Sequence, residues 1–155
     1  MVARQKSRLF TDPREKYGPP MIGALLRMPW ERVVRHMLER LHAEGFDDLD
    51  MPHMNLLLYP GPQGARPSEL AAQRSMTKQA ANYLLGQLEA LGYLERRPDP
   101  NDRRSKRIAL TARGERAAYT IRAAVRDMER DWQAQLGKDR FAQLKALLLE
   151  LNPPA

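Results

Sequence analysis

The sequence from residue 77 to residue 111, TKQAANYLLGQLEALGYLERRPDPNDRRSKRIALT, decides the fold of this chain. Its first half carries apolar side chains at helical spacing on one face, namely Ala81, Leu84, Leu85, Leu88 and Leu91. Thr77 can cap such a helix through its hydroxyl, and Gly92 stands at the usual C-terminal glycine position. The pattern therefore predicts an amphipathic helix that begins after Thr77 and ends at Gly92.

A second, shorter helix is predicted just before this one. Residues 68–74 place Leu70 and Ala71 inward, and a turn over residues 73–76 leads to Thr77. Two short helices joined by a tight turn, the second with a polar, exposed start, are typical of a helix-turn-helix. Any small helical domain can contain such a pair, and a polar helix face is usually just solvated. The residues after the second helix are therefore needed to distinguish a DNA-binding pair from an ordinary one.

The second half of the stretch predicts a hairpin with a basic tip. Residues 93–97 form a short extended segment that Pro98 stops, and residues 107–110 alternate polar with apolar side chains. The run between them, Asp99 to Lys106, has no apolar side chain and carries Arg103, Arg104 and Lys106. We expect this run to form a loop far longer than a two-residue turn, as in a wing that comes after a recognition helix.

These segments together resemble the multiple antibiotic resistance regulator (MarR) family of winged helix-turn-helix transcriptional regulators. The matching motifs are SELA at residues 68–71, residues 77–97 in full, DPNDRR at 99–104 and IALTARG at 108–114. The resemblance implies a mainly α fold with a small β-hairpin wing and with N- and C-terminal dimerisation helices. It implies a homodimer that represses or activates transcription, with repression expected, from a pseudo-palindromic site on double-stranded DNA. Such regulators often leave the DNA when a small aromatic ligand binds.

The resemblance also assigns roles to single residues. Recognition-helix positions fall on Thr77, Lys78, Gln79, Asn82 and Tyr83, and wing positions on Asp102, Arg103, Arg104 and Lys106. Arg104 matches the family's minor-groove arginine, and Asp102 matches the acidic residue that orients the guanidinium. The alternative interpretation of Asp102 is a turn-forming residue.

Three residues depart from the family pattern. Arg66 stands where a capping Ser or Thr is usual, and Arg74 where a leucine is usual. The first helix of the pair is therefore expected to end early or to extend an arginine toward phosphate. Tyr83 replaces a common arginine, so its ring is expected either to stack on DNA or simply to pack.

The flanking segments predict how the chain assembles. Residues 21–50 and 112–151 carry apolar stripes that a small winged domain cannot cover alone, which favours a helical dimerisation region, although an intrachain core also explains part of the stripes. Pro29 is expected to kink the first helix or to start a new one. Residues 1–20 are interpreted as a basic arm, and residues 51–111 as the DNA-binding lobe. Within that lobe the apolar run 51–59 fits either a helix or a strand.

Composition narrows the class of protein. The net charge is +7 with 20 Arg and 6 Lys among 155 residues, which favours polyanionic partners, although GC-rich codon usage explains the arginine total equally well. The absence of cysteine excludes disulfides and thiolate metal sites. No apolar run approaches membrane-spanning length and no signal peptide is recognisable, so a cytoplasmic protein without membrane contact is expected.

Other classes of function fit the sequence less well. An enzyme is not expected, because His36, His42 and His53 lack a triad-like or ligand-like context. No catalytic, cofactor-binding or metal-binding residue is therefore assigned, and His36 and His42 are interpreted as solvated. The main alternative is a non-specific DNA-packaging protein that uses the same wing. A protein-interaction module without DNA binding is disfavoured by Asp102 and Arg104. Segments bordering the family's ligand cleft carry Trp30, His53 and Met54, and core packing explains Trp30 and Met54 equally well.

Overall fold

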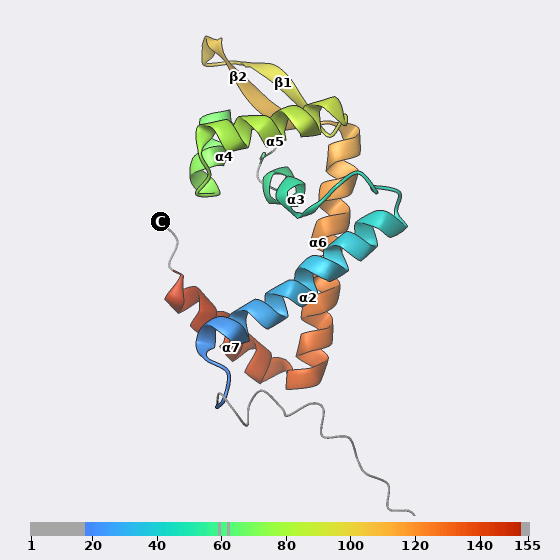
Figure 1. Ribbon diagram of the computed structural model, residues 1–155, viewed down its shortest axis with the longest axis vertical. Helices are drawn as coiled ribbons and strands as arrows, with labels where there is room; N and C mark the ends of the chain where they lie inside the picture. The colour runs from blue at the N-terminus through green and yellow to red at the C-terminus, as the bar shows by residue number, and fades with distance from the viewer. Residues whose placement is uncertain (1–17, 59, 62, 153–155) are drawn as a thin grey trace, which may run out of the picture. The chain divides into compact units, whose positions relative to one another are not determined.

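The computed structural model describes residues 18–58, 60, 61 and 63–152, apart from the side chain of Arg103. In chain order the elements are α2 (Ile22–Ala43), α3 (Met51–Leu57), α4 (Pro67–Gln73), α5 (Lys78–Ala90), β1 (Leu94–Asp99), β2 (Asp102–Leu110), α6 (Ala112–Leu136) and α7 (Lys138–Leu151) (Figure 1). The fold is thus mainly α with one antiparallel hairpin, as the sequence predicts. Most of the expected N-terminal arm lies outside the described residues.

The chain divides into two compact units, residues 1–32 and 33–155. The described part of the first unit consists of residues 18–32, which hold the first half of α2. Its apolar side chains are largely exposed, namely Met21, Ile22, Leu25, Leu26, Met28 and Trp30. Because α2 continues through Pro29, the proline does not start a new helix.

The hydrophobic core belongs to the second unit. The fully buried side chains come from several elements and include Leu41, Leu56, Leu57, Leu70, Leu85, Leu88, Tyr93, Ile108 and Ile121. Burial of each leucine or isoleucine favours folding by about 1.5–3 kcal/mol. This core packs α3 against α5 and α6, so the polar face of α5 is left toward solvent.

The apolar run from residue 51 forms a helix rather than a strand. Asp50 caps α3, because its Oδ1 accepts a hydrogen bond from the backbone N of His53 at 3.2 Å. In return, the backbone N of Asp50 donates to Nδ1 of His53 at 3.3 Å. Pro52 occupies the first turn, where its missing N–H costs nothing. Local capping chemistry thus resolves the ambiguity that apolar spacing leaves open.

The predicted helix-turn-helix is confirmed in α4 and α5. Thr77 caps α5 by accepting a hydrogen bond from the backbone N of Ala80 at 3.1 Å. At the other end Gly92 adopts a φ of 77°, and the backbone N of Tyr93 closes onto the carbonyl of Leu88 at 2.9 Å. The turn between the helices includes Ser75 at a φ of 51°.

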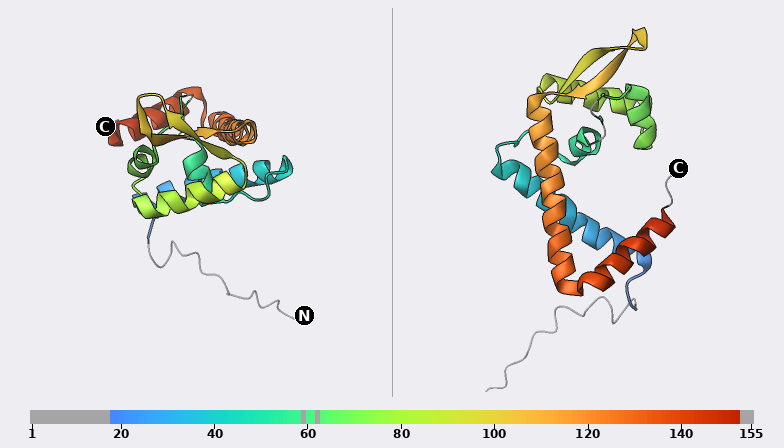
Figure 2. Two further views of the ribbon diagram at one scale, coloured as in Figure 1. Left: turned by 90° about the horizontal axis from the view of Figure 1, so that it is seen from above. Right: turned by 180° about the vertical axis from the view of Figure 1, so that it is seen from behind.

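The expectation of an eight-residue loop from Asp99 to Lys106 is wrong. Strand β1 continues through Pro98, which pairs with Lys106, and β2 begins at Asp102, with a register shift after Pro98. Each strand of a two-stranded hairpin is an edge strand. A proline whose nitrogen faces away from the other strand therefore removes no inter-strand hydrogen bond. The tip faces solvent and needs no apolar alternation, which is why its strands look like a loop in the sequence. Figure 2 shows the hairpin from two further sides.

The last two helices begin at residues with local boundary chemistry. Thr111 accepts a hydrogen bond from the backbone N of Gly114 at 3.1 Å, and Gly137 separates α6 from α7 with a φ of 84°. Of the helices in the described part, none combines the length and apolar character that a membrane crossing requires.

One expectation about the histidines is corrected. His36 is half-buried, and its Nε2 is buried without a hydrogen-bond partner among the described residues, so it is not a solvated residue. It faces inward because α2 buries Val33 and Met37 on neighbouring positions. His42 is exposed, as expected.

Candidate nucleic-acid interface

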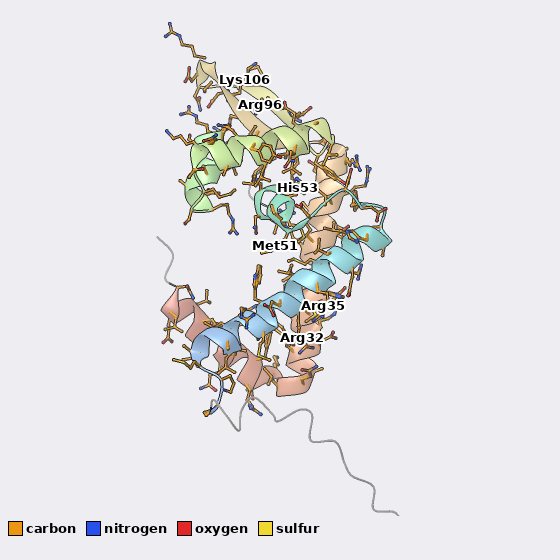
Figure 3. The ribbon with its side chains drawn as sticks, in the orientation of Figure 1. Arg32, Arg35, Met51, His53, Arg96 and Lys106 are labelled. Carbon is orange, nitrogen blue, oxygen red and sulfur yellow. The ribbon has the colours of Figure 1, made fainter. Side chains whose placement is uncertain are left out.

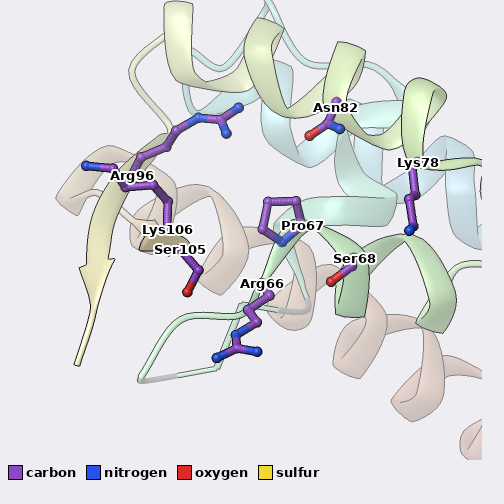
Figure 4. Close-up of a pocket in the computed structure, with 8 residues that line it drawn as sticks. All are labelled: Arg66, Pro67, Ser68, Lys78, Asn82, Arg96, Ser105 and Lys106. Atoms are coloured by element: carbon purple, nitrogen blue, oxygen red, sulfur yellow. The ribbon is translucent and has the colours of Figure 1, made fainter. Parts of the chain in front are cut away.

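A polar hollow of about 390 Å³ lies where α4, α5 and the hairpin meet. Figure 4 shows Arg96, Ser105 and Lys106 of the hairpin across from Lys78 and Asn82 of α5. Its other lining residues are Arg66, Pro67 and Ser68. Four of the eight side chains are cationic and none is anionic, so the hollow suits an anion or a polar edge.

The residues predicted for the recognition helix lie on the exposed side of α5. Lys78, Gln79, Asn82 and Tyr83 are all exposed, and Lys78 and Asn82 also line the hollow. Tyr83 is 67% exposed, and its hydroxyl accepts a hydrogen bond from Nε2 of Gln87 at 3.2 Å. Its ring therefore does not pack into the core. Thr77 differs from the others because its hydroxyl caps the helix.

The residues predicted for the wing lie on β2 rather than in a loop. Arg104 and Lys106 are exposed, and Lys106 lines the hollow from its strand, as Figures 3 and 4 show. Oδ1 of Asp102 accepts a hydrogen bond from the backbone N of Arg104 at 3.0 Å. Within the described contacts Asp102 thus shapes the turn and does not touch the Arg104 guanidinium. The side chain of Arg103 is not among the described atoms.

The cations of this surface differ in whether their charge is already paired. Arg96 donates to Glu89 at 3.0 Å and Arg97 to Glu95 at 2.6 Å. Lys78, Arg104 and Lys106 make no side-chain hydrogen bond or ion pair within the described part of the chain. An unpaired ammonium or guanidinium is available for a charge-assisted bond to an external anion. These three residues therefore have the charge that a phosphate backbone can use.

The buried carboxylate of this surface, Asp99, is absent from the residues predicted from the sequence, and it is only 2% exposed. Its oxygens accept hydrogen bonds from Nε of Arg66 at 2.9 Å, the backbone N of Asn101 at 3.0 Å and Oγ of Ser105 at 3.3 Å. Arg107 approaches it to 3.6 Å. The Asn101 N–H and then the Arg66 guanidinium hold the pKa of Asp99 below its usual range. The signal available in the sequence was the unusual Arg66.

The segment before α4 is fastened to the hairpin. The backbones of Ala65 and Ile108 exchange hydrogen bonds of 2.9 and 2.7 Å. Arg107 donates to the carbonyls of Gln63 at 3.1 Å and Gly64 at 2.7 Å. Gly64 has a φ of 71°, and a Cβ there would lie 2.6 Å from the Ile108 carbonyl oxygen, so a larger residue would push this segment away from β2. The hairpin is thus held in one position beside α4.

Helix α4 ends at Gln73, one residue before the predicted end at Arg74, and the arginines on either side of it have intramolecular partners. The helix spans Pro67–Gln73, and the backbone N of Arg66 donates to Glu69 at 2.8 Å instead of being served by a capping hydroxyl. Arg74 donates to Asn55 of α3 at 3.1 Å. Within the described residues, no group of three or more His, Cys, Asp or Glu could hold a metal ion.

Comparison with known proteins agrees with this geometry. A sequence model of the MarR family matches residues 47–105. Wild-type MarR from E. coli in its apo form superposes with a TM-score of 0.67 at 26% identity, over 87% of this chain and 99% of that one. The S. aureus MepR–DNA complex gives 0.69 at 23% identity, over 86% and 97%. CouR from Rhodococcus jostii RHA1, bound to p-coumaroyl-CoA, gives 0.68 at 24%, over 86% and 93%. No curated protein sequence matches the chain.

Helices α4 and α5 with the hairpin β1–β2 define a winged helix-turn-helix protein. Two findings narrow this class to one family. The family model matches the lobe, and the fold of MarR matches nearly the whole chain. The chain thus has the fold of the MarR family of transcriptional regulators, and its DNA-binding lobe matches the sequence model of that family.

Proposed function

We propose that this protein is a sequence-specific DNA-binding regulator without catalytic activity, a cytoplasmic bacterial repressor that binds a pseudo-palindromic operator as a homodimer. One observation carries the proposal: exposed donors that have no partner among the described residues lie on both sides of one hollow, on α5 and on β2. Residues 51–111 bind DNA in this proposal, residues 21–50 and 112–151 dimerise, and residues 1–20 form a basic arm.

The two sides of the hollow have different tasks. Helix α5 enters the major groove, where the amides of Gln79 and Asn82 can contact base edges. Arg104 reaches the adjacent minor groove, and Lys78 and Lys106 neutralise phosphates. The MepR–DNA complex, which shares this fold, supports the choice of DNA as the partner.

A homodimer is supported by apolar surface in each unit taken by itself. In α7, Leu144, Leu147 and Leu151 are exposed, and residues 18–32 expose a second apolar set. Burial of such surface against a second copy is favourable, and a two-fold axis would place two α5 helices on successive turns of DNA.

Release by a small aromatic compound completes the proposal. CouR is bound to p-coumaroyl-CoA, an aromatic acyl compound, which supports this class of ligand. The test is a screen of aromatic acids for loss of operator binding at fixed salt. Failure of every member to change affinity would argue against release by this class.

The DNA proposal is tested by selecting duplexes from a random pool and titrating salt on the best site and on a scrambled duplex. Asn82→Ala should cost about 1–3 kcal/mol on the selected site and leave scrambled binding nearly unchanged. Arg104→Ala should weaken both and reduce the salt slope by about one. Gln135→Ala, an exposed polar change on α6 outside the lobe, is the matched control.

The same titration separates a regulator from a packaging protein. Specific binders usually prefer their site by at least about a thousandfold. A wild-type preference below about a hundredfold, with Asn82→Ala without effect, would favour the packaging protein.

A further inference from the structure

The carboxylate of Asp99 lies at one end of the hollow, behind two of its lining side chains. Arg66 and Ser105 both line the hollow, and both hydrogen-bond to Oδ2 of Asp99, at 2.9 and 3.3 Å. Asp99 does not itself line the hollow, because its side chain is buried. An anionic group therefore stands directly under a surface whose exposed side chains include four cations.

Arg66 differs from the two lysines of the hollow. Its Nε is bound to Asp99, whereas Lys78 and Lys106 have no partner in the described structure. Its side chain is nevertheless 40% exposed, so its remaining donors reach solvent. The Nε of a guanidinium held this way can turn to an external anion only if the buried carboxylate loses its charge. Removal of one partner from a buried pair is costly, so the pair is persistent.

The Arg66–Asp99 pair also joins two elements that face DNA. Arg66 is the residue before α4, and Asp99 is the last residue of β1. Together with the Ala65–Ile108 bridge, the pair fixes the hairpin relative to α4 and α5. A change at Asp99 therefore affects both the position of the wing and the charge of the hollow.

We propose that Asp99 is a positioning residue that restrains non-specific DNA binding by holding the Arg66 guanidinium away from phosphate and the hairpin against α4. This inference rests on the proposed function, since it concerns how the same surface distinguishes an operator from other DNA. It assigns Arg66 an intramolecular partner and leaves phosphate contact to Lys78, Lys106 and Arg104.

The first test compares two cations of the hollow on scrambled duplex. Arg66→Ala should lower affinity for scrambled DNA less than Lys106→Ala does, because the charge of Arg66 is already paired with Asp99. Lys106→Ala should lower that affinity on the order of tenfold at about 0.1 M salt and reduce the salt slope by about one. Equal losses in the two variants would overturn the inference.

The second test uses Asp99→Asn, which keeps the shape and the acceptor for the Asn101 N–H. With the charge removed, Arg66 is released, so affinity for scrambled duplex should rise on the order of tenfold and the salt slope should steepen by about one. Affinity for the operator should rise less, because the wing is less well fixed, and specificity should fall. Asp99→Asn combined with Arg66→Ala should return scrambled binding to the wild-type value.

Asp47→Asn is the matched control, because it makes the same change of net charge at an exposed carboxylate without a hydrogen bond or ion pair in the described structure. A gain equal to that of Asp99→Asn would show that net charge alone is responsible, and the inference would fail. A purely structural role predicts loss of affinity for both duplexes and no dependence on Arg66. If wild-type protein shows no operator preference, the proposed function fails, while the Arg66 and Lys106 comparison still decides the charge assignment.

Discussion

Gly114, in the first turn of α6, lies against the backbone just before β1 and against the last residue of β2. A Cβ built there would be 2.0 Å from the carbonyl oxygen of Tyr93 and 3.1 Å from Cδ2 of Leu110. Backbone cannot move aside as a flexible side chain can, so only glycine fits without a shift. The glycine of the IALTARG motif thus has a packing reason that is independent of DNA.

At the residue scale we predict opposite effects for two glycine substitutions. Gly114→Ala should destabilise the protein by about 1–3 kcal/mol, because α6 must move away from the hairpin. Gly86→Ala, within α5 and with open space around its Cβ position, should stabilise by up to about 1 kcal/mol. Urea unfolding of both variants at one protein concentration measures this. A neutral Gly114→Ala would contradict the close approach.

At the element scale, Tyr93 joins three segments. Its buried hydroxyl donates to Asp48 in the loop before α3, and Arg113 of α6 lies over its ring at 4.3 Å. Arg113 also donates to Asp48 at 2.9 Å and to the carbonyl of Leu91 at 2.7 Å. The ends of α5 and β1 are thereby tied to α6. The lobe is held by this junction as well as by the core.

The junction shifts two pKa values in opposite directions. Burial first, then the bond to Asp48, raises the pKa of Tyr93, so its contribution is complete below pH 10.0 and is lost as pH rises above it. Burial alone would raise the pKa of Asp48, but the Tyr93 hydroxyl and the Arg113 charge outweigh it and lower that pKa. The contribution of Asp48 is therefore complete above pH 3.8 and is lost as pH falls below it.

We predict that Tyr93→Phe costs about 1.5–3 kcal/mol at neutral pH, since it removes a hydrogen bond to a charged group. The stability of the variant should also fall less than that of the wild type as the pH rises above 10.0. Tyr119→Phe is the control, because Tyr119 is 66% exposed and its hydroxyl has no partner in the described structure. Thermal melts across pH test this, and identical alkaline profiles for Tyr93→Phe and wild type would be inconsistent with the junction.

At the scale of the whole molecule, the proposed dimer makes stability depend on concentration. The midpoint of thermal unfolding should rise with protein concentration if folded subunits associate. Leu147→Glu, on the exposed apolar face of α7, should shift the protein toward monomer and remove that dependence. Ala142→Glu is the control on the other side of the helix. Sedimentation that shows a wild-type monomer at micromolar concentration would exclude the dimer.

Helices and their ends could be predicted because their causes are local. Apolar spacing, the capping hydroxyls of Thr77 and Thr111, and the glycines at 92 and 137 act within a few residues. The extent of the hairpin could not be predicted, because polar strands without a buried face show no alternation. The fold class and the family motifs were therefore predictable from the sequence, and the boundaries of β1 and β2 were not.

The sequence by itself determined the order of the elements, the polar face of α5 and the presence of a basic hairpin after it. Tertiary structure decided which of those charges are free. Asp99 and Arg66 are 33 residues apart, and only folding brings them within 2.9 Å and buries the carboxylate. The physical reason is that a charge interacts with its neighbours in space, whereas a sequence pattern records neighbours along the chain.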